Sequence, residues 1–436
     1  MKKSKYKVYL IIFLNLLLRY SYSQTWSEQV VPPNTPALYS VNAVNSNVCW
    51  ASGDNGCVLY TSDGGITWIN RSNTIFLGNR INVICGIDSV TADCTITINQ
   101  TAVSIIFRST DKGVSWLPVY NQMNGNIRDI KMSANNVIGY AYGDPVGGIW
   151  TFLRTTDRGA TFSAVGPVLS QSGNEHGNYR AMAVSQLFVF LGTSNNKIHR
   201  FTILAPTWIS SASQYLNTYA VGFDLAGLNG LSGGNPSSLS NSINSGLLWI
   251  LQAGLPGSGD CNTIGNIDLQ FWYARGPNIY YSNDLLGLIF NQQYICPNNG
   301  TYEQMSFTNI QGQDNIESTI RGWGVTNNGS LSVYNGQLSE IKKIKQEIPS
   351  EYKLSQNFPN PFNPSTSIEY SLKGSGNITL RVFNAEGKLI TTLFSGYLTA
   401  GSYKISWEAA GFSSGVYFYK LSSGSFTESR KMLLIK

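Results

Sequence analysis

An eight-residue pattern recurs three times in the first half of the chain and limits its fold more than any other feature. The pattern is Ser/Thr-x-Asp-x-Gly-x-Ser/Thr-Trp/Phe, and its aspartates lie 48 and then 46 residues apart. Repeats of this length indicate a β-propeller, in which each repeat forms one four-stranded blade. The three copies contain Thr61, Asp63, Gly65, Thr67 and Trp68; Ser109, Asp111, Gly113, Ser115 and Trp116; and Thr155, Asp157, Gly159, Thr161 and Phe162.

Each copy has the composition of a tight turn between two strands. An Asp side chain accepts hydrogen bonds from the backbone N–H groups of its own turn, and Gly adopts positive φ without steric cost. The aromatic residue then begins the next strand. The copies resemble the Asp-box (BNR) repeats of sialidases, sortilin-type receptors, xyloglucanases and photosystem assembly propellers. This resemblance implies a structural role for the box on the outer rim, away from the ligand face.

Composition supports an all-β fold with a propeller as its main domain. Only 12% of the residues are charged, whereas 43 are Gly, 24 are Tyr and 10 are Trp. Aromatic residues and turn formers in this abundance are typical of short strands joined by tight turns. Residues 24–340, at roughly 45 residues per blade, predict seven blades. Six blades is the alternative, because residues 210–250 are rich in Gly, Ser and Asn.

The first 23 residues have the features of a secretory signal peptide. Four lysines precede an apolar run, residues 8–18, that is shorter than the ~20 residues of a membrane span. Small residues at positions 21 and 23 precede Gln24. We therefore expect export by the Sec machinery, cleavage before Gln24 and no transmembrane span in the mature protein.

The formal net charge of +6 comes from the two ends of the chain. The signal segment carries five basic residues and no acidic one, and residues 352–436 carry nine basic and four acidic residues. Residues 24–351 therefore have a net charge of −4, which argues against nucleic acid as a partner. The sequence contains no phosphate-binding loop or metal motif, so no cofactor is expected.

Six cysteines, an even number on an exported chain, predict disulfides rather than free thiols. Proximity in the sequence favours three pairs among the fifteen pairings that six cysteines permit. The favoured pairs are Cys49–Cys57, Cys85–Cys94 and Cys261–Cys296. None belongs to a C-x-x-C motif and the two histidines lie far apart, so no structural zinc site is expected.

The composition changes near residue 340. Residues 341–351 are rich in Lys and Glu and are predicted to form an exposed linker. A lead segment with three prolines follows, and prolines exclude a regular strand ladder there. Alternating polar and apolar residues with turns at short spacing then predict a small Ig-like β-sandwich over residues 352–436.

The same region resembles the type A C-terminal sorting domain of type IX secretion in Bacteroidetes-like bacteria. The resemblance covers about 85 residues of this chain and rests on residues at both ends of the domain. It implies crossing of the outer membrane by the type IX apparatus and removal of the domain, with the product released or joined to surface lipopolysaccharide. The matching positions include Asn357, Pro359, Asn360, Pro361, Phe362, Asn363, Pro364, Gly401, Gly415, Val416, Tyr417 and Lys431.

Catalytic residues are harder to find. The Arg-Ile-Pro signature of sialidases is absent, and no Ser-His-Asp grouping is apparent. A glycoside hydrolase would need two carboxylates across a cleft. Candidates are Asp129, Asp144 and Asp224, with Glu175–His176 as an acid–base pair, but their sequence context does not distinguish them from turn and loop residues.

We therefore expect a secreted or surface-attached propeller that acts as a non-catalytic binding or scaffolding module, with a glycan or an envelope protein as its partner. The alternative is a secreted glycoside hydrolase or lyase that acts on polysaccharide. Two carboxylates about 5–9 Å apart in a central cleft would favour hydrolysis, and a plain channel would favour binding.

Overall fold

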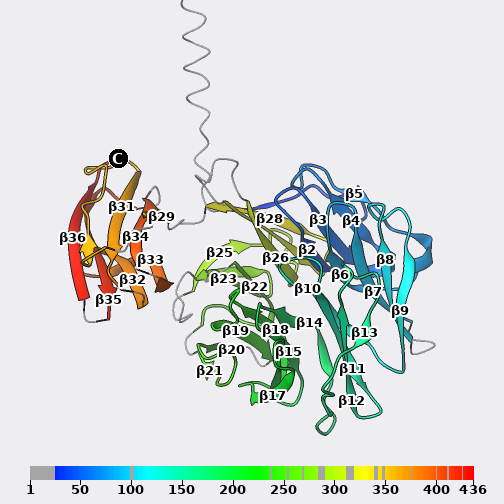
Figure 1. Cartoon of the computed structure of the whole chain (residues 1–436). Helices are drawn as coiled ribbons and strands as arrows, with labels where there is room; N and C mark the ends of the chain where they lie inside the picture. Colours follow the sequence, from blue (N-terminus) through cyan, green and yellow to red (C-terminus); the bar gives the residue numbers. More distant parts are fainter. Residues whose placement is uncertain are drawn as a thin grey trace, which may run out of the picture.

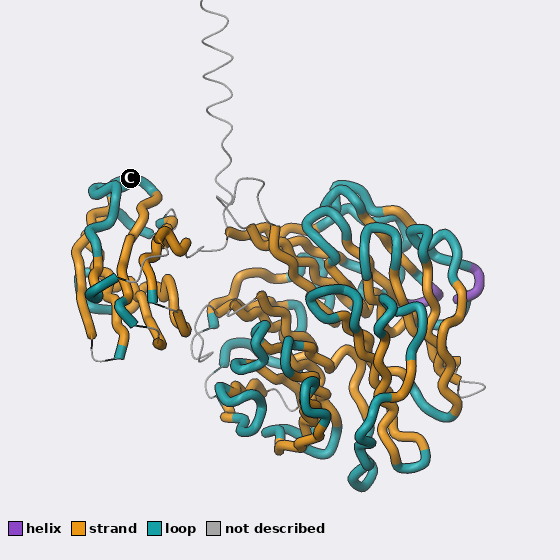
Figure 2. The backbone as a smooth tube through the Cα atoms, viewed as in Figure 1, coloured by secondary structure: helices purple, strands orange, loops and turns teal. Residues whose placement is uncertain are grey.

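The computed structural model describes residues 25–98, 103–235, 238–252, 255–267, 270–282, 290–310, 319–337, 342–345, 349–374, 376–398, 400–409, 412–424 and 426–436. The predicted signal peptide, residues 1–23, lies outside this part of the chain. Figures 1 and 2 show strands joined by loops, with helix confined within the described residues to two 3-10 turns, η1 (Asp54–Gly56) and η2 (Thr74–Phe76). The prediction of an all-β protein is confirmed.

Among the described residues, seven four-stranded antiparallel sheets form the blades of a propeller, numbered here in chain order. Blade 1 contains β2 (Leu38–Ala43), β3 (Cys49–Gly53), β4 (Val58–Thr61) and β5 (Ile69–Asn70), and blade 2 contains β6 (Ile81–Gly86), β7 (Ala92–Ile98), β8 (Val103–Ser109) and β9 (Leu117–Met123). Blade 3 contains β10 (Ile127–Met132), β11 (Gly139–Val146), β12 (Ile149–Thr155) and β13 (Ser163–Ala164), and blade 4 contains β14 (Gly177–Val184), β15 (Phe188–Thr193), β16 (Lys197–Thr202) and β17 (Thr207–Ala212). Blade 5 contains β18 (Asn217–Phe223), β19 (Gly230–Asn235), β20 (Ser238–Ser242) and β21 (Ile250–Leu251), and blade 6 contains β22 (Cys261–Ile267), β23 (Gln270–Arg275), β24 (Asn278–Ser282) and β25 (Asn291–Ile295).

Blade 7 is assembled from both ends of the propeller. It contains β26 (Tyr302–Ile310), β27 (Thr319–Thr326) and β28 (Leu331–Gln337), and its fourth strand is the N-terminal β1 (Thr25–Glu28). Strands β1 and β28 are antiparallel, with Thr25 opposite Asn335. Trp26 is 5% exposed and packs its ring against Tyr334. The preferred count of seven blades is therefore confirmed, and the ring is closed by pairing across more than three hundred residues.

The hydrophobic cores of the propeller lie between neighbouring blades. Trp323 and Val325 of blade 7 share one core with Leu38 and Cys49 of blade 1, and blades 3 and 4 share another around Tyr142. Second strands are therefore buried on both faces, and every residue of β3 is buried. The outermost strands of blades 1, 3 and 5 contain only two residues each, all exposed, and short edge strands limit pairing with other chains.

The three copies of the repeated pattern form one kind of hairpin, between the third and fourth strands of blades 1, 2 and 3. In the first copy the Thr61 hydroxyl donates to the Asp63 carboxylate at 2.8 Å and accepts the Gly65 N–H at 2.9 Å. The Asp63 carboxylate accepts the Thr67 N–H at 2.9 Å. The corresponding three contacts in the other two copies are 2.8, 2.8 and 2.9 Å.

A fourth copy in blade 5 forms the same turn with a different sequence. The Ser242 hydroxyl donates to the Asn244 side chain at 3.0 Å and accepts the Gly246 N–H at 2.9 Å, and Asn244 accepts the Leu248 N–H at 3.0 Å. Trp249 then occupies the aromatic position and is 2% exposed. The sequence pattern missed this copy because Asn replaces Asp and Leu replaces Ser or Thr.

The six cysteines are buried thiols, which differs from the predicted disulfides. In the register of blade 2, Cys85 lies opposite Asp93 whereas Cys94 lies opposite Ile84. This offset of one residue turns the two thiols to opposite faces of the blade, so Cys94 packs toward blade 1 and Cys85 toward blade 3. Cys261 and Cys296 likewise lie in different cores. Cys49 and Cys57 share one core, but they too are unbonded.

The C-terminal region forms two four-stranded sheets packed as a sandwich. One contains β29 (Lys342–Lys345), β34 (Gly401–Glu408), β31 (Ser365–Leu372) and β30 (Lys353–Leu354), in that order. The other contains β33 (Leu389–Leu398), β32 (Gly376–Asn384), β35 (Gly415–Ser423) and β36 (Phe426–Leu434). Residues from both sheets, including Ile368 and Tyr419, form one core. Strand β29 falls inside the predicted linker of residues 341–351 and pairs with β34.

Candidate functional site

Strand register divides the loops of the propeller between two faces. The first strand of each blade begins where its second strand ends, as Leu38 opposite Gly53 shows in blade 1 and Tyr302 opposite Thr326 shows in blade 7. Connections between blades and hairpins between second and third strands therefore meet on one face, which we call the connection face. The hairpins of the repeated pattern join third and fourth strands and lie on the other face, which we call the motif face.

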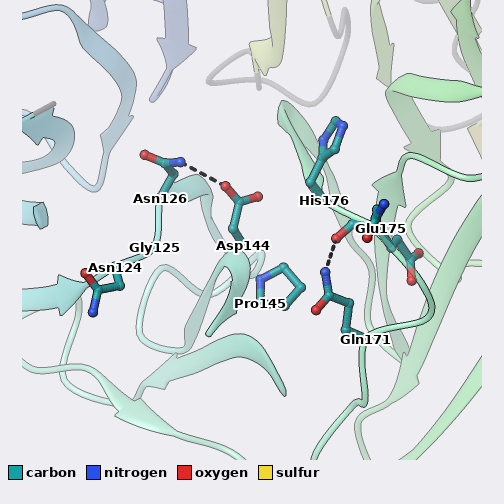
Figure 3. Close-up of a pocket in the computed structure, with 9 residues that line it drawn as sticks. Asn124, Gly125, Asn126, Asp144, Pro145, Gln171, Glu175 and His176 are labelled. Carbon is teal, nitrogen blue, oxygen red and sulfur yellow. Dashed lines mark hydrogen bonds between the residues drawn. The ribbon is translucent and has the colours of Figure 1, made fainter. Parts of the chain in front are cut away.

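On the connection face, blades 3 and 4 border a pocket of about 500 Å³ (Figure 3). Its walls come from the β9–β10 connection, the β11–β12 hairpin and the β13–β14 connection. Most of its side chains are neutral and polar, and amides predominate. The lining residues are Asn124, Gly125, Asn126, Asp144, Pro145, Gln171, Asn174, Glu175 and His176.

The carboxylate of Asp144 is held by four hydrogen bonds. Arg128 donates Nε to one oxygen at 2.9 Å and Nη2 to the other at 2.6 Å. Asn126 donates at 2.9 Å, and the Gly177 N–H donates at 2.9 Å. Burial acts to lower the pKa of Arg128, but the contact with Asp144 outweighs it and the pKa lies above its ordinary value. Each oxygen of Asp144 already accepts two bonds, so this carboxylate is poorly placed to act as a base.

Glu175 lines the pocket, but its carboxylate bonds to strands of blade 4. One oxygen accepts the Thr193 hydroxyl and His199 Nε2, both at 2.6 Å. Burial acts to raise the pKa of Glu175, but these hydrogen bonds outweigh it and the pKa lies below its ordinary value. His176 is exposed at the pocket, and its backbone N–H donates to Ser194. Glu175 and His176 therefore do not form an acid–base pair.

The contact between Glu175 and His199 extends to a serine, which the sequence did not reveal. His199 Nδ1 lies 2.7 Å from the Ser210 hydroxyl, on the neighbouring strand β17. Ser210 is exposed on the outermost strand of blade 4, whereas His199 is 1% exposed. Ser210 is not part of the pocket lining. These contacts account for both ring nitrogens of a buried histidine.

The other two candidate aspartates have structural roles. Asp129 is fully buried and accepts backbone N–H groups from Ile130 at 2.9 Å and Met182 at 3.1 Å, and burial raises its pKa. Asp224 follows β18 on the motif face and accepts the N–H groups of Leu228 and Asn229 within its own turn. The carboxylates of Asp129, Asp144 and Asp224 are thus each engaged in separate local networks.

A second group of charges crosses the centre of the propeller near the connection face. Arg180 of β14 donates to Glu303 of β26 at 3.1 Å and lies 3.5 Å from the Asn82 carbonyl of β6. Arg180 has φ of 63°, a conformation that is uncommon for a non-glycine residue. Burial raises the pKa of Glu303. The contact joins blades 2, 4 and 7 across the axis, and the wide separation of these residues hides it in the sequence.

The motif face is joined between blades by arginines. Arg108 of blade 2 donates to the Arg158 carbonyl in the turn of blade 3 at 2.5 Å, and Arg200 of blade 4 donates to the Ser245 carbonyl in blade 5 at 2.9 Å. Both carbonyls belong to the residue before the turn glycine. The fifteen residues of the predicted copies either end a third strand or lie in the hairpin that follows it, and the aromatic residue of each copy directly precedes the fourth strand.

The fold brings predicted sorting residues from the beginning and the end of the C-terminal sequence close together. The Asn357 side chain donates to Thr366 at 2.9 Å, and its backbone N–H donates to the Tyr419 hydroxyl at 2.8 Å. Phe362 donates its N–H to the Leu433 carbonyl and accepts the Ile435 N–H, both at 3.0 Å. The proline-rich lead therefore lies along the last strand, which carries Lys431.

Comparison with known families identifies the C-terminal part. Residues 356–436 match the family model described as "Secretion system C-terminal sorting domain". No curated protein sequence matches the chain. Within the described residues, no helix has the length and apolar character of a membrane span, and no group of three or more His, Cys, Asp or Glu could hold a metal ion.

Solved structures resemble the propeller. "YCF48 bound to D1 peptide" is 19% identical with a TM-score of 0.52 and covers 72% of this chain and 98% of its own. "YCF48 from Cyanidioschyzon merolae" is 18% identical with a TM-score of 0.52 and covers 71% and 98%. Raptor of Chaetomium thermophilum is 10% identical with a TM-score of 0.50 and covers 73% of this chain but 29% of its own. The chain thus combines a β-propeller with a type IX secretion sorting domain, which indicates a secreted or cell-surface protein.

Proposed function

We propose that this protein is a non-catalytic propeller that binds an extended polypeptide segment of a surface partner through its connection face. In this proposal the first 23 residues are cleaved, the repeated hairpins are Asp-boxes with a purely structural role, and the Ig-like C-terminal domain directs type IX secretion. The observation that carries the binding role is the pocket between blades 3 and 4. Its lining is rich in amides, and each of its two carboxylates already accepts hydrogen bonds from within the propeller.

The chemistry of the pocket favours a polypeptide. Within the described part of the chain, the side chains of Asn124 and Asn174 are exposed and donate to no other residue. Amides can donate to and accept from a peptide backbone at once. A propeller of the same fold is named as bound to a peptide. A glycan is the other partner expected from the sequence, but no similar observation supports it.

The binding role can be tested with the mature chain, residues 24–436, on an array of random-sequence peptides. We expect selective capture that Asn174→Arg reduces about ten-fold, because a large cation fills the pocket mouth. Ile66→Arg is the matched control, since Ile66 is 82% exposed on the motif face. Failure to capture any peptide, or equal loss in both variants, would refute the proposal.

The alternative of a glycoside hydrolase or lyase makes a separate prediction. Incubation of the mature chain with a panel of polysaccharides should release no reducing sugar or unsaturated product. Release that disappears in Asp144→Asn would establish the alternative, because Asp144 is one of the two carboxylates that line the pocket. The sorting role is tested by deleting residues 352–436, which should leave the protein in the periplasm.

A further inference from the structure

The two sheets of the C-terminal sandwich present different surfaces to solvent. Strands β31 and β34 carry polar residues outward, and these residues contact each other. Glu369 lies 3.3 Å from Lys404, and the hydroxyls of Ser367 and Ser406 are 3.3 Å apart. This is the usual pattern for an antiparallel sheet with one solvated face.

The outer face of the second sheet breaks that pattern. Val416, Phe418 and Leu433 point outward and are 36%, 38% and 36% exposed. In the register, Val416 lies opposite Leu433, and Phe418 lies between Phe383 and Lys431. The apolar side chains are therefore neighbours across β32, β35 and β36, and together they make a continuous patch. Contiguous exposed apolar patches mark interaction sites more often than scattered residues do.

The charge on this face has one sign. Arg381, Lys420 and Lys431 occupy outward positions beside the apolar residues. No carboxylate occupies the outward positions described on β32, β35 and β36. These positions are Thr379, Arg381, Phe383, Val416, Phe418, Lys420, Ser422, Thr427, Ser429, Lys431 and Leu433. We call this surface the basic–apolar face.

The proline-rich lead fixes the strand that carries much of this face. The Leu433 N–H donates to the Asn360 side chain at 2.9 Å, and the Leu433 carbonyl accepts the Phe362 N–H at 3.0 Å. Gln356 donates to the Lys431 carbonyl at 2.7 Å. The two sequence segments that mark the sorting domain therefore meet at the edge of the basic–apolar face.

We propose that the basic–apolar face docks on a protein of the type IX apparatus whose surface has an apolar centre bordered by carboxylates. This inference rests on the sorting role given above and adds the surface that performs it. Charge complementarity identifies the chemistry of the partner, because like charges across an interface are unfavourable. Apolar side chains at the centre supply the contact area, and lysines at its border supply orientation.

The test is export of the full chain from its host, measured as the fraction of protein reached by added protease on intact cells. There are two docking variants. One is the single substitution Lys431→Glu, and the other is the double substitution Phe418→Ser with Leu433→Ser. Lys404→Glu is the matched control, because Lys404 is a half-exposed lysine on the polar face of the same sandwich. We expect the docking variants to lower surface exposure about ten-fold and Lys404→Glu to leave it within about two-fold.

Folding is checked on the retained protein. The periplasmic Lys431→Glu protein should resist limited proteolysis of its C-terminal domain like the wild type, and Lys431→Arg should be exported normally. Normal export of both docking variants would overturn the proposal. So would equal loss with Lys404→Glu, or binding of the full chain to anionic lipid vesicles that Lys431→Glu abolishes while export is unchanged. Deletion of residues 352–436 distinguishes failure of the docking proposal from failure of the sorting role. Continued export after this deletion would contradict the sorting role itself.

Discussion

The two faces of the propeller satisfy their polar groups in different ways. On the motif face, the repeated hairpins of blades 1, 2, 3 and 5 form the same turn hydrogen bonds within eight residues, and arginines add contacts to the next blade. On the connection face, charged groups join distant parts of the chain, such as Arg180 and Glu303, and amides remain exposed around a pocket. A turn that forms its hydrogen bonds locally can be repeated, whereas contacts between distant residues can differ from blade to blade and so carry specificity.

The largest effect at a fixed pH should come from a Cβ on a glycine of the motif face. Gly159 has φ of +82°, and a Cβ there would lie 1.9 Å from the Asp93 carboxylate. We expect Gly159→Ala to lower the free energy of unfolding by about 3–5 kcal/mol, because steric overlap adds to the cost of positive φ. Urea denaturation measures this loss.

The control is Gly147→Ala on the connection face, where φ is +61° and nothing lies within 4 Å of the added Cβ. Only the backbone term remains, so the loss should be about 1 kcal/mol. Equal losses at the two positions would mean that the close packing between blades 2 and 3 has no energetic role.

The ion pairs of the connection face should differ with burial. Arg128 and Asp144 have side chains only 16% and 14% exposed, so Arg128→Ala leaves a buried carboxylate without its counter-charge and should cost about 3 kcal/mol. Arg80 and Asp54 are 47% and 35% exposed, and Arg80→Ala should cost less than about 1 kcal/mol. Chemical denaturation of the two variants tests whether the buried pair stabilises the pocket wall more than the exposed pair does. A smaller loss of unfolding free energy in Arg128→Ala than in Arg80→Ala would contradict this expectation.

A pH dependence is expected where the motif face meets the next blade. Burial raises the pKa of Asp93 to about 8, against the opposing effect of Arg108. Because the folded-state pKa exceeds the unfolded value of about 4, folding takes up a proton between these values. The contribution of Asp93 to stability is therefore complete below about pH 4 and is lost as the pH rises to about 8.

The measurement is the unfolding free energy of wild type and Asp93→Asn across this range. The wild type should lose up to about 1.4 kcal/mol per pH unit relative to the variant. Parallel curves for the two proteins would show that Asp93 is ionised throughout.

A small effect should come from substituting the repeated aspartates themselves. Asn244 supports the same turn in blade 5, accepting the Leu248 N–H at 3.0 Å. Asp111→Asn loses the accepting atom for the Ser115 hydroxyl but keeps the accepting atom for its N–H, so it should cost about 1 kcal/mol. Thermal unfolding measures the change, and a loss as large as that of Gly159→Ala would show that the carboxylate charge itself holds the turn.

This contrast also explains what the sequence could predict. Asp63, Gly65 and Trp68 act within one hairpin, so their spacing alone reveals the turn and, through its repetition, the propeller. The C-terminal sandwich was readable for the same reason, because alternation along each strand identifies its buried face. Asn244 shows that the same turn can form where the sequence departs from the pattern.

The pocket and the cysteines depend on register and on contacts between blades. The sequence around Asp144 is that of a turn, and only the structure shows that Arg128, on another strand, donates to its carboxylate. Cys85 and Cys94 are close in sequence, yet a register offset of one residue separates them into two cores. Side-chain direction at a single position decides both cases, and proximity in the sequence does not supply it.

The pairing of β1 with β28 has a consequence for export. A chain that crosses a membrane from its N-terminus delivers β1 first, and β1 then has no partner until β28 has followed. Blades 1 to 6 use consecutive strands and can fold as they emerge, whereas blade 7 needs both ends. The ring can therefore close only when β28 has emerged, and the sorting domain is the next part of the chain to follow. Completion of the propeller and exposure of the sorting domain are thus consecutive steps of export.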